Sequence, residues 1–446
     1  MQPALLPHPS SFIFESYAFD AETCVLNLKY KTVPGRNYTE TIKFPMPSIA
    51  PNTAQLAAFD RAAKLLFLLA GVSYYKTTVA DKISCDVPMD APTADFLREV
   101  YLKGLGEFAY RNELDLDARL QFTATTTDKP TPVKLDGRGS LVPVGGGKDS
   151  IVSIEILRAQ GNDIALFALA STPTPAGPIA ATIAASGLPA CVAVRTLSPE
   201  LLQANKDGAY NGHVPITAIL SVIALGTAIL HGKKSVIMSN EHSASTPNLV
   251  RGALEINHQY SKSYEFEAAL QNYIHGYVSP DLEYFSLLRP LSEVAIARQF
   301  AKHEKYHAIF RSCNTAFRQD VAARGTQWCC ACPKCRFVFL ALAPFMAKEK
   351  LVKIFGQDLL NDPAQRDGFA ELCGLEAFKP FECVGEVDES ALLLKKLSEM
   401  PEWQDDAVVK ELAPRLRVHG SFDDLFALKT PHAVPADYLE MLHARA

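Results

Sequence analysis

Six consecutive residues, Gly145-Gly146-Gly147-Lys148-Asp149-Ser150, lie between an apolar run at 140–144 and a helix-like segment at 151–158. Adjacent glycines lack a Cβ, so their backbone can approach an anion closely and direct several N–H groups toward it. A helix beginning at about Asp149 would add its positive N-terminal dipole at the same point. This order of strand, glycine turn and helix predicts a phosphate-binding loop.

Beyond this loop, apolar runs that we predict as strands alternate with helical patterns. The runs are at 164–170, 190–194 and 235–238. Such alternation is typical of a parallel sheet covered on both faces, with ligands at the carboxyl ends of its strands. We therefore expect an α/β fold with a parallel, doubly wound core and the glycine loop at its ligand-binding edge.

The chain has 446 residues, of which 48% are hydrophobic and 21% charged, so it has room for two to three domains. Alternating runs within 11–44 predict a β-meander, two helical patterns follow it, and a polar linker occupies 123–139. We expect an N-terminal α+β domain at 1–130, a catalytic domain at 135–350 and a helical C-terminal region at 351–446.

Charge and hydropathy exclude several classes of function. A net charge of −5 offers no basic surface for nucleic acid. The N-terminus lacks a positive segment followed by a long apolar one, so we expect no signal peptide and a cytoplasmic protein. The uncharged run at 214–230 only reaches the lower limit of about 17 residues for crossing a bilayer. We predict a buried core helix there and no membrane insertion.

Five of the ten cysteines fall between residues 313 and 335. Cys329, Cys332 and Cys335 follow a Cys-x-x-Cys-x-x-Cys spacing, and Cys313 supplies a fourth thiolate, enough for a closed tetrahedral zinc shell. We predict a structural zinc site with Cys330 as a spare; reduced core cysteines, or a redox pair at Cys332 and Cys335, are the alternatives. The remaining cysteines are expected to be isolated, small buried hydrophobic side chains: Cys24, Cys85, Cys191, Cys373 and Cys383.

A dense polar stretch follows the predicted strand at 235–238. Polar groups directly after a buried strand are typical of an α/β active-site loop. Glu241 and His242 are candidate general bases, and Lys262 or Arg251 could hold a carboxylate or phosphate. The alternative for each residue is a solvated loop or helix face.

The glycine loop resembles the Ser-Gly-Gly-x-Asp-Ser loop of the PP-loop ATP pyrophosphatases, with Gly145 in place of the first serine. It is not a Walker A loop, because Asp149 follows the lysine. The resemblance implies cleavage of ATP between its α and β phosphates, with an adenylated substrate as the other product. A turn that merely joins a strand to a helix is the alternative. The cysteine spacing is similar to that of 7-cyano-7-deazaguanine synthase, another PP-loop enzyme.

Across nearly its full length the chain resembles the UDP-N-acetyl-muramoyl-L-alanyl-L-glutamate epimerase family. That family inverts the terminal glutamate of UDP-MurNAc-L-Ala-L-Glu during peptidoglycan precursor synthesis, using ATP and Mg²⁺ and releasing AMP and pyrophosphate. The resemblance implies the same small-molecule substrate here and an acyl-adenylate intermediate. Five segments carry it: 11–15, 144–150, 239–241, 257–263 and 332–345.

This resemblance implies roles for the candidate site residues. The glycines Gly145, Gly146 and Gly147, together with Ser150, would hold pyrophosphate, Lys148 would stabilise developing charge, and Asp149 would help to place Mg²⁺. A base among four residues would remove the α-proton of the glutamate: Glu241, His242, His258 and Lys262.

Two other functions stay open at this level. One is a different PP-loop enzyme, either a nitrile-forming enzyme or an amide-forming ligase, that acts on a small carboxylate. The tRNA-thiolating relatives fit the negative net charge of the chain less well. The other is a zinc-stabilised nucleotide-binding protein without catalytic activity. Release of pyrophosphate separates the enzymes from the binding protein, and its dependence on substrate separates the epimerase from a ligase.

Overall fold

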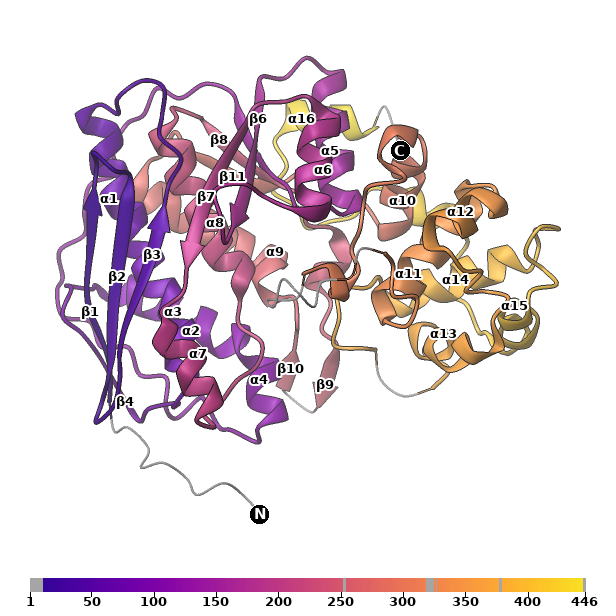
Figure 1. Ribbon diagram of the computed structural model, residues 1–446, viewed down its shortest axis with the longest axis horizontal. Helices are drawn as coiled ribbons and strands as arrows, with labels where there is room; N and C mark the ends of the chain where they lie inside the picture. The colour runs from indigo at the N-terminus through magenta and orange to yellow at the C-terminus, as the bar shows by residue number, and fades with distance from the viewer. Residues whose placement is uncertain (1–10, 252–253, 318–324, 326, 377–378, 444–446) are drawn as a thin grey trace.

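The computed structural model describes residues 11–251, 254–317, 325, 327–376 and 379–443. A single nine-stranded sheet runs through it in the order β11-β8-β5-β6-β7-β3-β2-β1-β4 (Figure 1). Helices cover both faces of this sheet, and a group of short helices extends to one side. The α/β class predicted from the sequence is confirmed.

The N-terminal part of the sheet is the predicted meander. β1 (Ser11–Asp20), β2 (Val25–Val33) and β3 (Asn37–Lys43) pair antiparallel in sequence order, and β4 (Lys82–Cys85) adds a parallel edge strand to β1. The helices of this part are α1 (Thr53–Ala70), α2 (Val72–Tyr75), α3 (Ala91–Gly104) and α4 (Gly106–Arg111).

The parallel part of the sheet follows the predicted alternation. β5 (Ser140–Pro143), β6 (Ile164–Ala170), β7 (Ala190–Thr196), β8 (Ser235–Met238) and β11 (Glu283–Ser286) are mutually parallel. β7 also pairs antiparallel with β3. The parallel core that we predicted is therefore continuous with the meander, and the sheet as a whole is mixed. Its assignment as a PP-loop core stays a prediction.

The apolar run at 214–230 forms α8 (Ile216–Leu230), which packs against α1 and is buried along most of its length. The core helix predicted there is confirmed. Within the described residues, no helix has both the length and the apolar character that a membrane span requires. The other helices near the sheet are α5 (Lys148–Ala159), α6 (Gly177–Ser186), α7 (Pro199–Lys206), α9 (Tyr264–Tyr273) and α10 (Glu293–Ala301).

Two hydrophobic cores lie on opposite faces of the sheet, because successive side chains of a strand point to opposite sides. On β8, Val236 belongs to the core formed with α1 and α8, whereas Ile237 belongs to the core formed with α5 and α10. The second core also contains residues of the C-terminal helices. These are α11 (Pro333–Leu342), α12 (Lys348–Phe355), α13 (Arg366–Leu372), α14 (Val387–Leu397), α15 (Ala407–Leu412) and α16 (Ala436–His443).

The C-terminal region is helical, as the sequence indicates, and α16 returns to the sheet. The rings of Phe285 on β11 and Tyr438 on α16 lie 5.2 Å apart. The domain boundaries near 130 and 350 stay predictions.

Candidate functional site

The glycine loop connects β5 to α5 at the carboxyl end of the parallel strands. Gly146 has a φ of +76°, and a Cβ there would lie 2.7 Å from the Cβ of Pro178. A Cβ on Gly147 would lie 2.7 Å from the Ser312 hydroxyl oxygen, so neither position has room for a side chain. Gly147 is the N-cap of α5, and no described side chain caps this helix. An anion can thus approach the backbone of this loop closely, because its glycines carry no side chain. The N–H groups of the first turn of α5 are available to bind it.

Lys148 is buried at the start of α5 between two carboxylates. Its ammonium donates to Asp149 at 2.5 Å and to Glu293 on α10. Burial lowers the pKa of Lys148, but the attraction of these carboxylates outweighs burial and raises the pKa above its ordinary value. Burial, together with the nearby Asp149 and Glu241, raises the pKa of Glu293, while Lys148 opposes that rise. Sequence reasoning missed Glu293, which no local motif marks.

Glu241 follows β8 and is buried. Arg289, which has no exposed surface, donates from Nη1 to the Glu241 carbonyl at 2.6 Å. Its Nη2 donates to the Lys262 carbonyl and, at 2.9 Å, to the buried carboxylate of Glu267. Arg289 therefore fixes the backbones of two predicted site residues against each other, a role that the sequence did not reveal.

Lys262 lies in the 3₁₀ turn Tyr260–Lys262, and its ammonium donates to the sulfur of Cys383 at 3.3 Å. The charges of Cys383, Glu241 and Asp149 together raise the pKa of Lys262 above its ordinary value, although burial opposes them. Asp149 belongs to the glycine loop and Cys383 to the C-terminal region. Lys262 is thus the electrostatic link between the predicted phosphate site and the polar stretch after β8.

His258 hydrogen-bonds both Glu107 on α4 and Cys383. Burial lowers the pKa of His258, but these two hydrogen bonds outweigh burial and raise it to about 9. The other oxygen of Glu107 accepts from Arg111 Nε at 2.6 Å. The result is a chain of three side chains, Cys383, His258 and Glu107, in which a thiol, an imidazole and a carboxylate follow one another.

The prediction that Cys383 is an isolated hydrophobic side chain is wrong. Burial alone would raise the pKa of its thiol, but the Lys262 charge and the His258 hydrogen bond lower it to about 6. Cys383 is only partly buried. Its partners are far away in the sequence, so no spacing of residues could reveal the cluster before the fold was known.

His242 stays apart from this cluster. Burial lowers its pKa, and the charged groups that act on it are Glu386, Lys429 and Arg289. Its Nδ1 has no hydrogen-bond partner among the described residues. Of the four predicted bases, the structure therefore joins Glu241, His258 and Lys262 through shared neighbours and leaves His242 outside.

The segment at 379–389, from the C-terminal region, contacts the other residues of the site. The Pro380 carbonyl accepts from Asn248 Nδ2 at 2.8 Å, and Glu386 accepts from the Thr246 hydroxyl at 2.8 Å. On α14, Glu389 accepts from the Glu293 backbone N–H at 3.3 Å. Lys379 lies near Glu386 and Glu389, and its buried ammonium has no hydrogen-bond partner among the described residues. The segment is thus held both to the loop after β8 and to α10.

The four cysteines that we predicted as zinc ligands come together. Their sulfur atoms all lie within 4.8 Å of one another. Cys335 lies 3.6 Å from Cys329 and 3.5 Å from Cys332, close to the roughly 3.8 Å edge of a tetrahedron with Zn–S bonds of about 2.3 Å. The predicted spare, Cys330, points away and donates to the Phe355 carbonyl at 3.4 Å. The donor set fits zinc; the presence of the metal stays a prediction.

A second group of potential ligand atoms consists of Glu107, His213 and His258. Glu107 already accepts hydrogen bonds from His258 and Arg111, and the Lys262 ammonium donates to the sulfur of Cys383. Burial lowers the pKa of His213 to about 4. We interpret Glu107, through its hydrogen bond, and His213, whose ring centroid lies 4.2 Å from that of His258, as residues that position His258.

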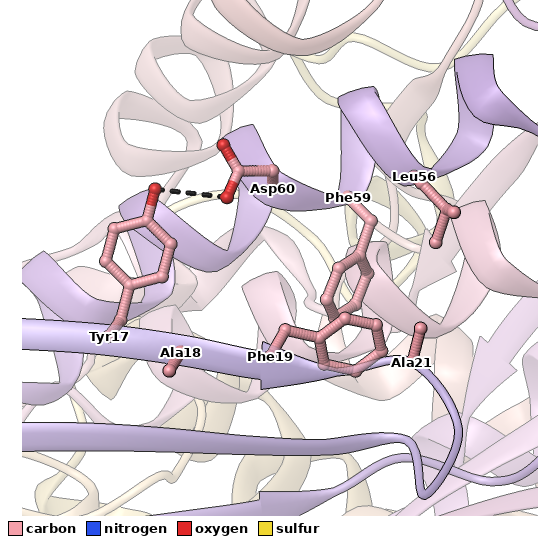
Figure 2. A pocket seen from close by; sticks show the side chains of 7 residues that line it. All are labelled: Tyr17, Ala18, Phe19, Ala21, Leu56, Phe59 and Asp60. Carbon is pink, nitrogen blue, oxygen red and sulfur yellow. Dashed lines mark hydrogen bonds between the residues drawn. The ribbon is translucent and has the colours of Figure 1, made fainter.

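A separate pocket opens between β1 and α1 (Figure 2). Its lining is mostly apolar, and its single carboxylate, Asp60, accepts from the Tyr17 hydroxyl at 3.2 Å. None of its lining residues belongs to the glycine loop or to the cluster around Cys383. This pocket lacks the groups that phosphate binding or proton transfer requires.

Comparison with known proteins gives two family matches. Residues 6–287 match the model of the MurL N-terminal domain, and residues 309–423 match that of the MurL C-terminal domain. Three similar proteins carry the name UDP-N-acetyl-alpha-D-muramoyl-L-alanyl-L-glutamate epimerase.

These relatives are similar over almost their whole length. The protein of Xanthomonas oryzae pv. oryzae is 43% identical over 442 residues, which cover 98% of this chain and 97% of the relative. That of Salinispora tropica is 45% identical over 407 residues, or 90% and 88% of the two chains. That of a Micromonospora species is 42% identical over 442 residues, or 97% of each chain.

Proposed function

The chain belongs to the MurL family, and from that membership we propose that it inverts the terminal L-glutamate of UDP-MurNAc-L-Ala-L-Glu to the D form. We further propose that ATP activates the glutamate α-carboxylate as an acyl-adenylate, with AMP and pyrophosphate as the nucleotide products. The family membership supports the epimerase, and the glycine loop supports the use of a nucleotide.

Activation answers the main chemical difficulty of this reaction. Removing a proton α to a carboxylate would produce a dianion, which is a high-energy species. An acyl-adenylate has lost that negative charge, so its carbonyl can accept the electron pair of the Cα–H bond. Adenylation therefore makes the α-proton removable by an ordinary side-chain base.

The glycine loop supplies the groups for the nucleotide. The backbone of Gly145, Gly146 and Gly147 and the first turn of α5 would hold the phosphates, with the Ser150 hydroxyl as a further donor. Lys148 is held in place by Asp149 and Glu293, so its charge is available without reorganisation. Of the two carboxylates, Asp149 is the more exposed: 32% of its side-chain surface is accessible, against 6% for Glu293. Asp149 is therefore our candidate ligand for Mg²⁺.

The donor set fits magnesium. Mg²⁺ in nucleotide-dependent enzymes is usually held by one or two carboxylates together with substrate phosphates, and it retains waters. Asp149 at the mouth of the glycine loop meets that requirement. The ion would neutralise charge on the departing pyrophosphate.

The observation that carries the proposal is the position of Lys262. Its ammonium nitrogen lies 3.3 Å from the sulfur of Cys383. The charges of Glu241 and Asp149 also act on Lys262 and raise its pKa. This position supports a single site that combines the groups suited to proton transfer with the loop suited to phosphate. A protein that only binds a nucleotide would have no need for the first set.

The test is to incubate the protein with ATP, Mg²⁺ and UDP-MurNAc-L-Ala-L-Glu in D₂O. We expect AMP and pyrophosphate in amounts that depend on the dipeptide substrate, D-glutamate on chiral analysis after hydrolysis, and deuterium at the α-carbon. The analogue with an α-carboxamide should be inert, because it has no carboxylate to adenylate.

Other products would identify another function. ADP with inorganic phosphate would contradict the pyrophosphatase assignment. An amide or nitrile product would indicate a ligase or a nitrile-forming enzyme. Nucleotide binding without pyrophosphate release would indicate a non-catalytic protein.

A further inference from the structure

Cys383 has the surroundings of a reactive thiolate. The Lys262 ammonium donates to its sulfur at 3.3 Å, and His258 hydrogen-bonds it. His258 is in turn held by Glu107, whose second oxygen is fixed by Arg111. This is the arrangement of nucleophile or base, imidazole and orienting carboxylate that activates thiols in general.

The segment that carries Cys383 is docked on the rest of the site. Thr246 and Asn248, from the loop after β8, hydrogen-bond Glu386 and Pro380 on either side of it. The Glu389 carboxylate receives the N–H of Glu293, whose own carboxylate binds Lys148. The segment that carries the thiol is thereby held to the loop after β8 and, through Glu293 and Lys148, to the start of α5.

We propose that the Cys383 thiolate is the base that removes the α-proton of the activated glutamate. The inference deepens the proposed epimerase function and rests on it. His258, Glu107 and Lys262 are positioning residues: they hold the sulfur in its charged form and in place.

The step balances as follows. The Cα–H bond breaks, an S–H bond forms on Cys383, and the electron pair moves into the acyl carbonyl of the adenylate. A second acid, in exchange with solvent, delivers a proton to the opposite face of Cα. The Cys383 thiol then loses its proton to solvent, and water cleaves the adenylate to release AMP.

The charged groups that face Cys383 favour this role over His258 and Lys262, two of the bases predicted from the sequence. Lys262 from its 3₁₀ turn, His258 from the loop before it and Lys334 from α11 together lower the pKa of the thiol to about 6, against the effect of burial. Lys334 also pairs with Glu382 at 3.4 Å. With a pKa of about 9, His258 is protonated at neutral pH, and Lys262 stays cationic. Both are therefore donors to the sulfur rather than acceptors of the α-proton.

The catalytic test compares Cys383→Ala and Cys383→Ser with the wild type and with Cys191→Ala, a partly buried cysteine on β7 outside the site. We expect both Cys383 variants to lose about 100-fold or more in epimerisation and in α-deuterium uptake, the usual contribution of a positioned base. Substrate-dependent formation of pyrophosphate in a single turnover should stay within several-fold of wild type. Cys191→Ala should behave as wild type.

A second test measures the thiolate without relying on turnover. The alkylation of Cys383 by iodoacetamide, followed by peptide mass spectrometry, should rise with a midpoint near pH 6 instead of the ordinary value of about 8.5 for a cysteine. Lys262→Met should move that midpoint upward. A wild-type midpoint near the ordinary value would overturn the proposal.

The outcomes separate this inference from the function on which it rests. A wild-type protein with neither inversion nor α-exchange would contradict both the proposed epimerase function and the role of Cys383. Wild-type inversion together with normal exchange in Cys383→Ala would remove only the role of Cys383. A substrate adduct on Cys383 that hydroxylamine releases would make the residue a nucleophile and would also overturn the role as a base.

Discussion

The backbone N–H of Arg311 donates to the carbonyl of Gly146 at 2.9 Å. Arg311 lies two residues before Cys313, the first member of the cysteine cluster, and Gly146 is the residue of the glycine loop with a positive φ. The neighbouring Ser312 occupies the space that a side chain on Gly147 would need. The cysteine cluster and the glycine loop are thus joined by one short segment, so loss of order in the cluster should reach the loop.

We predict that the purified protein holds one zinc ion bound by Cys313, Cys329, Cys332 and Cys335. Because a structural zinc site contributes directly to folding, Cys332→Ser or a strong chelator should lower the Tm and also slow pyrophosphate release. Elemental analysis and thermal unfolding measure these effects.

Cys330→Ser is the matched control. Cys330 hydrogen-bonds the Phe355 carbonyl, and a serine hydroxyl can donate to the same acceptor. Its zinc content should equal that of the wild type. Protein without stoichiometric metal, or Cys332→Ser with unchanged zinc content and Tm, would contradict the zinc prediction.

Asp149→Asn should slow ATP cleavage by roughly 100-fold, since by our proposal it removes the carboxylate that would hold Mg²⁺ beside the departing pyrophosphate. Lys148 keeps its buried partner Glu293, so the thermal stability should change little. The comparison variant is Asp163→Asn, whose carboxylate is largely exposed beside Lys233. Equal rates of AMP formation in the two variants would refute the role of Asp149.

Arg289→Met should destabilise the fold by roughly 3–5 kcal/mol, because it leaves the Glu267 carboxylate buried without its partner. Adding Glu267→Gln should restore part of the loss by removing the uncompensated charge. Urea unfolding gives both values. Arg98→Met, which breaks an exposed pair with Asp117, should cost below about 1 kcal/mol. If Arg289→Met cost no more than Arg98→Met, the buried pair of Arg289 with Glu267 would not stabilise the fold.

The parts of this fold that depend on local pattern could be predicted from the sequence. The strands β6 and β8 have the same bounds as the apolar runs at 164–170 and 235–238, because a strand buried on both faces is largely apolar. The cysteine cluster could be predicted because three of its members lie within seven consecutive residues, 329–335. The antiparallel pairing of β3 with β7 could not, since nothing in either strand specifies a distant partner.

The part of the site that we propose for acid–base chemistry depends on the fold in the same way. Glu107 lies on α4, His258 in the loop after β10 (Leu254–Ile256) and Cys383 before α14, and each is unremarkable in its own segment. Only the tertiary structure brings them together. The prediction of a base among Glu241, His242, His258 and Lys262 stays a prediction, and it did not include the C-terminal segment whose Cys383 contacts Lys262.

Glu389 gives a prediction for stability against pH. Burial and the neighbouring Glu386 raise the pKa of Glu389 from 4.5 to about 7, so the folded state favours its neutral form. The stability that this preference contributes is complete below about pH 4.5 and is lost as the pH rises through 7. Glu389→Gln cannot titrate, so the stability of the wild type relative to this variant should fall by up to about 3 kcal/mol between pH 5 and 8. Urea unfolding across that range measures the difference.

Ser390→Ala, on the next residue of the same helix, is the control. It removes a hydroxyl that donates to the Glu386 carbonyl and should lower stability by an amount independent of pH. A difference between wild type and Glu389→Gln that stays constant with pH would show that Glu389 is ionised in the folded protein.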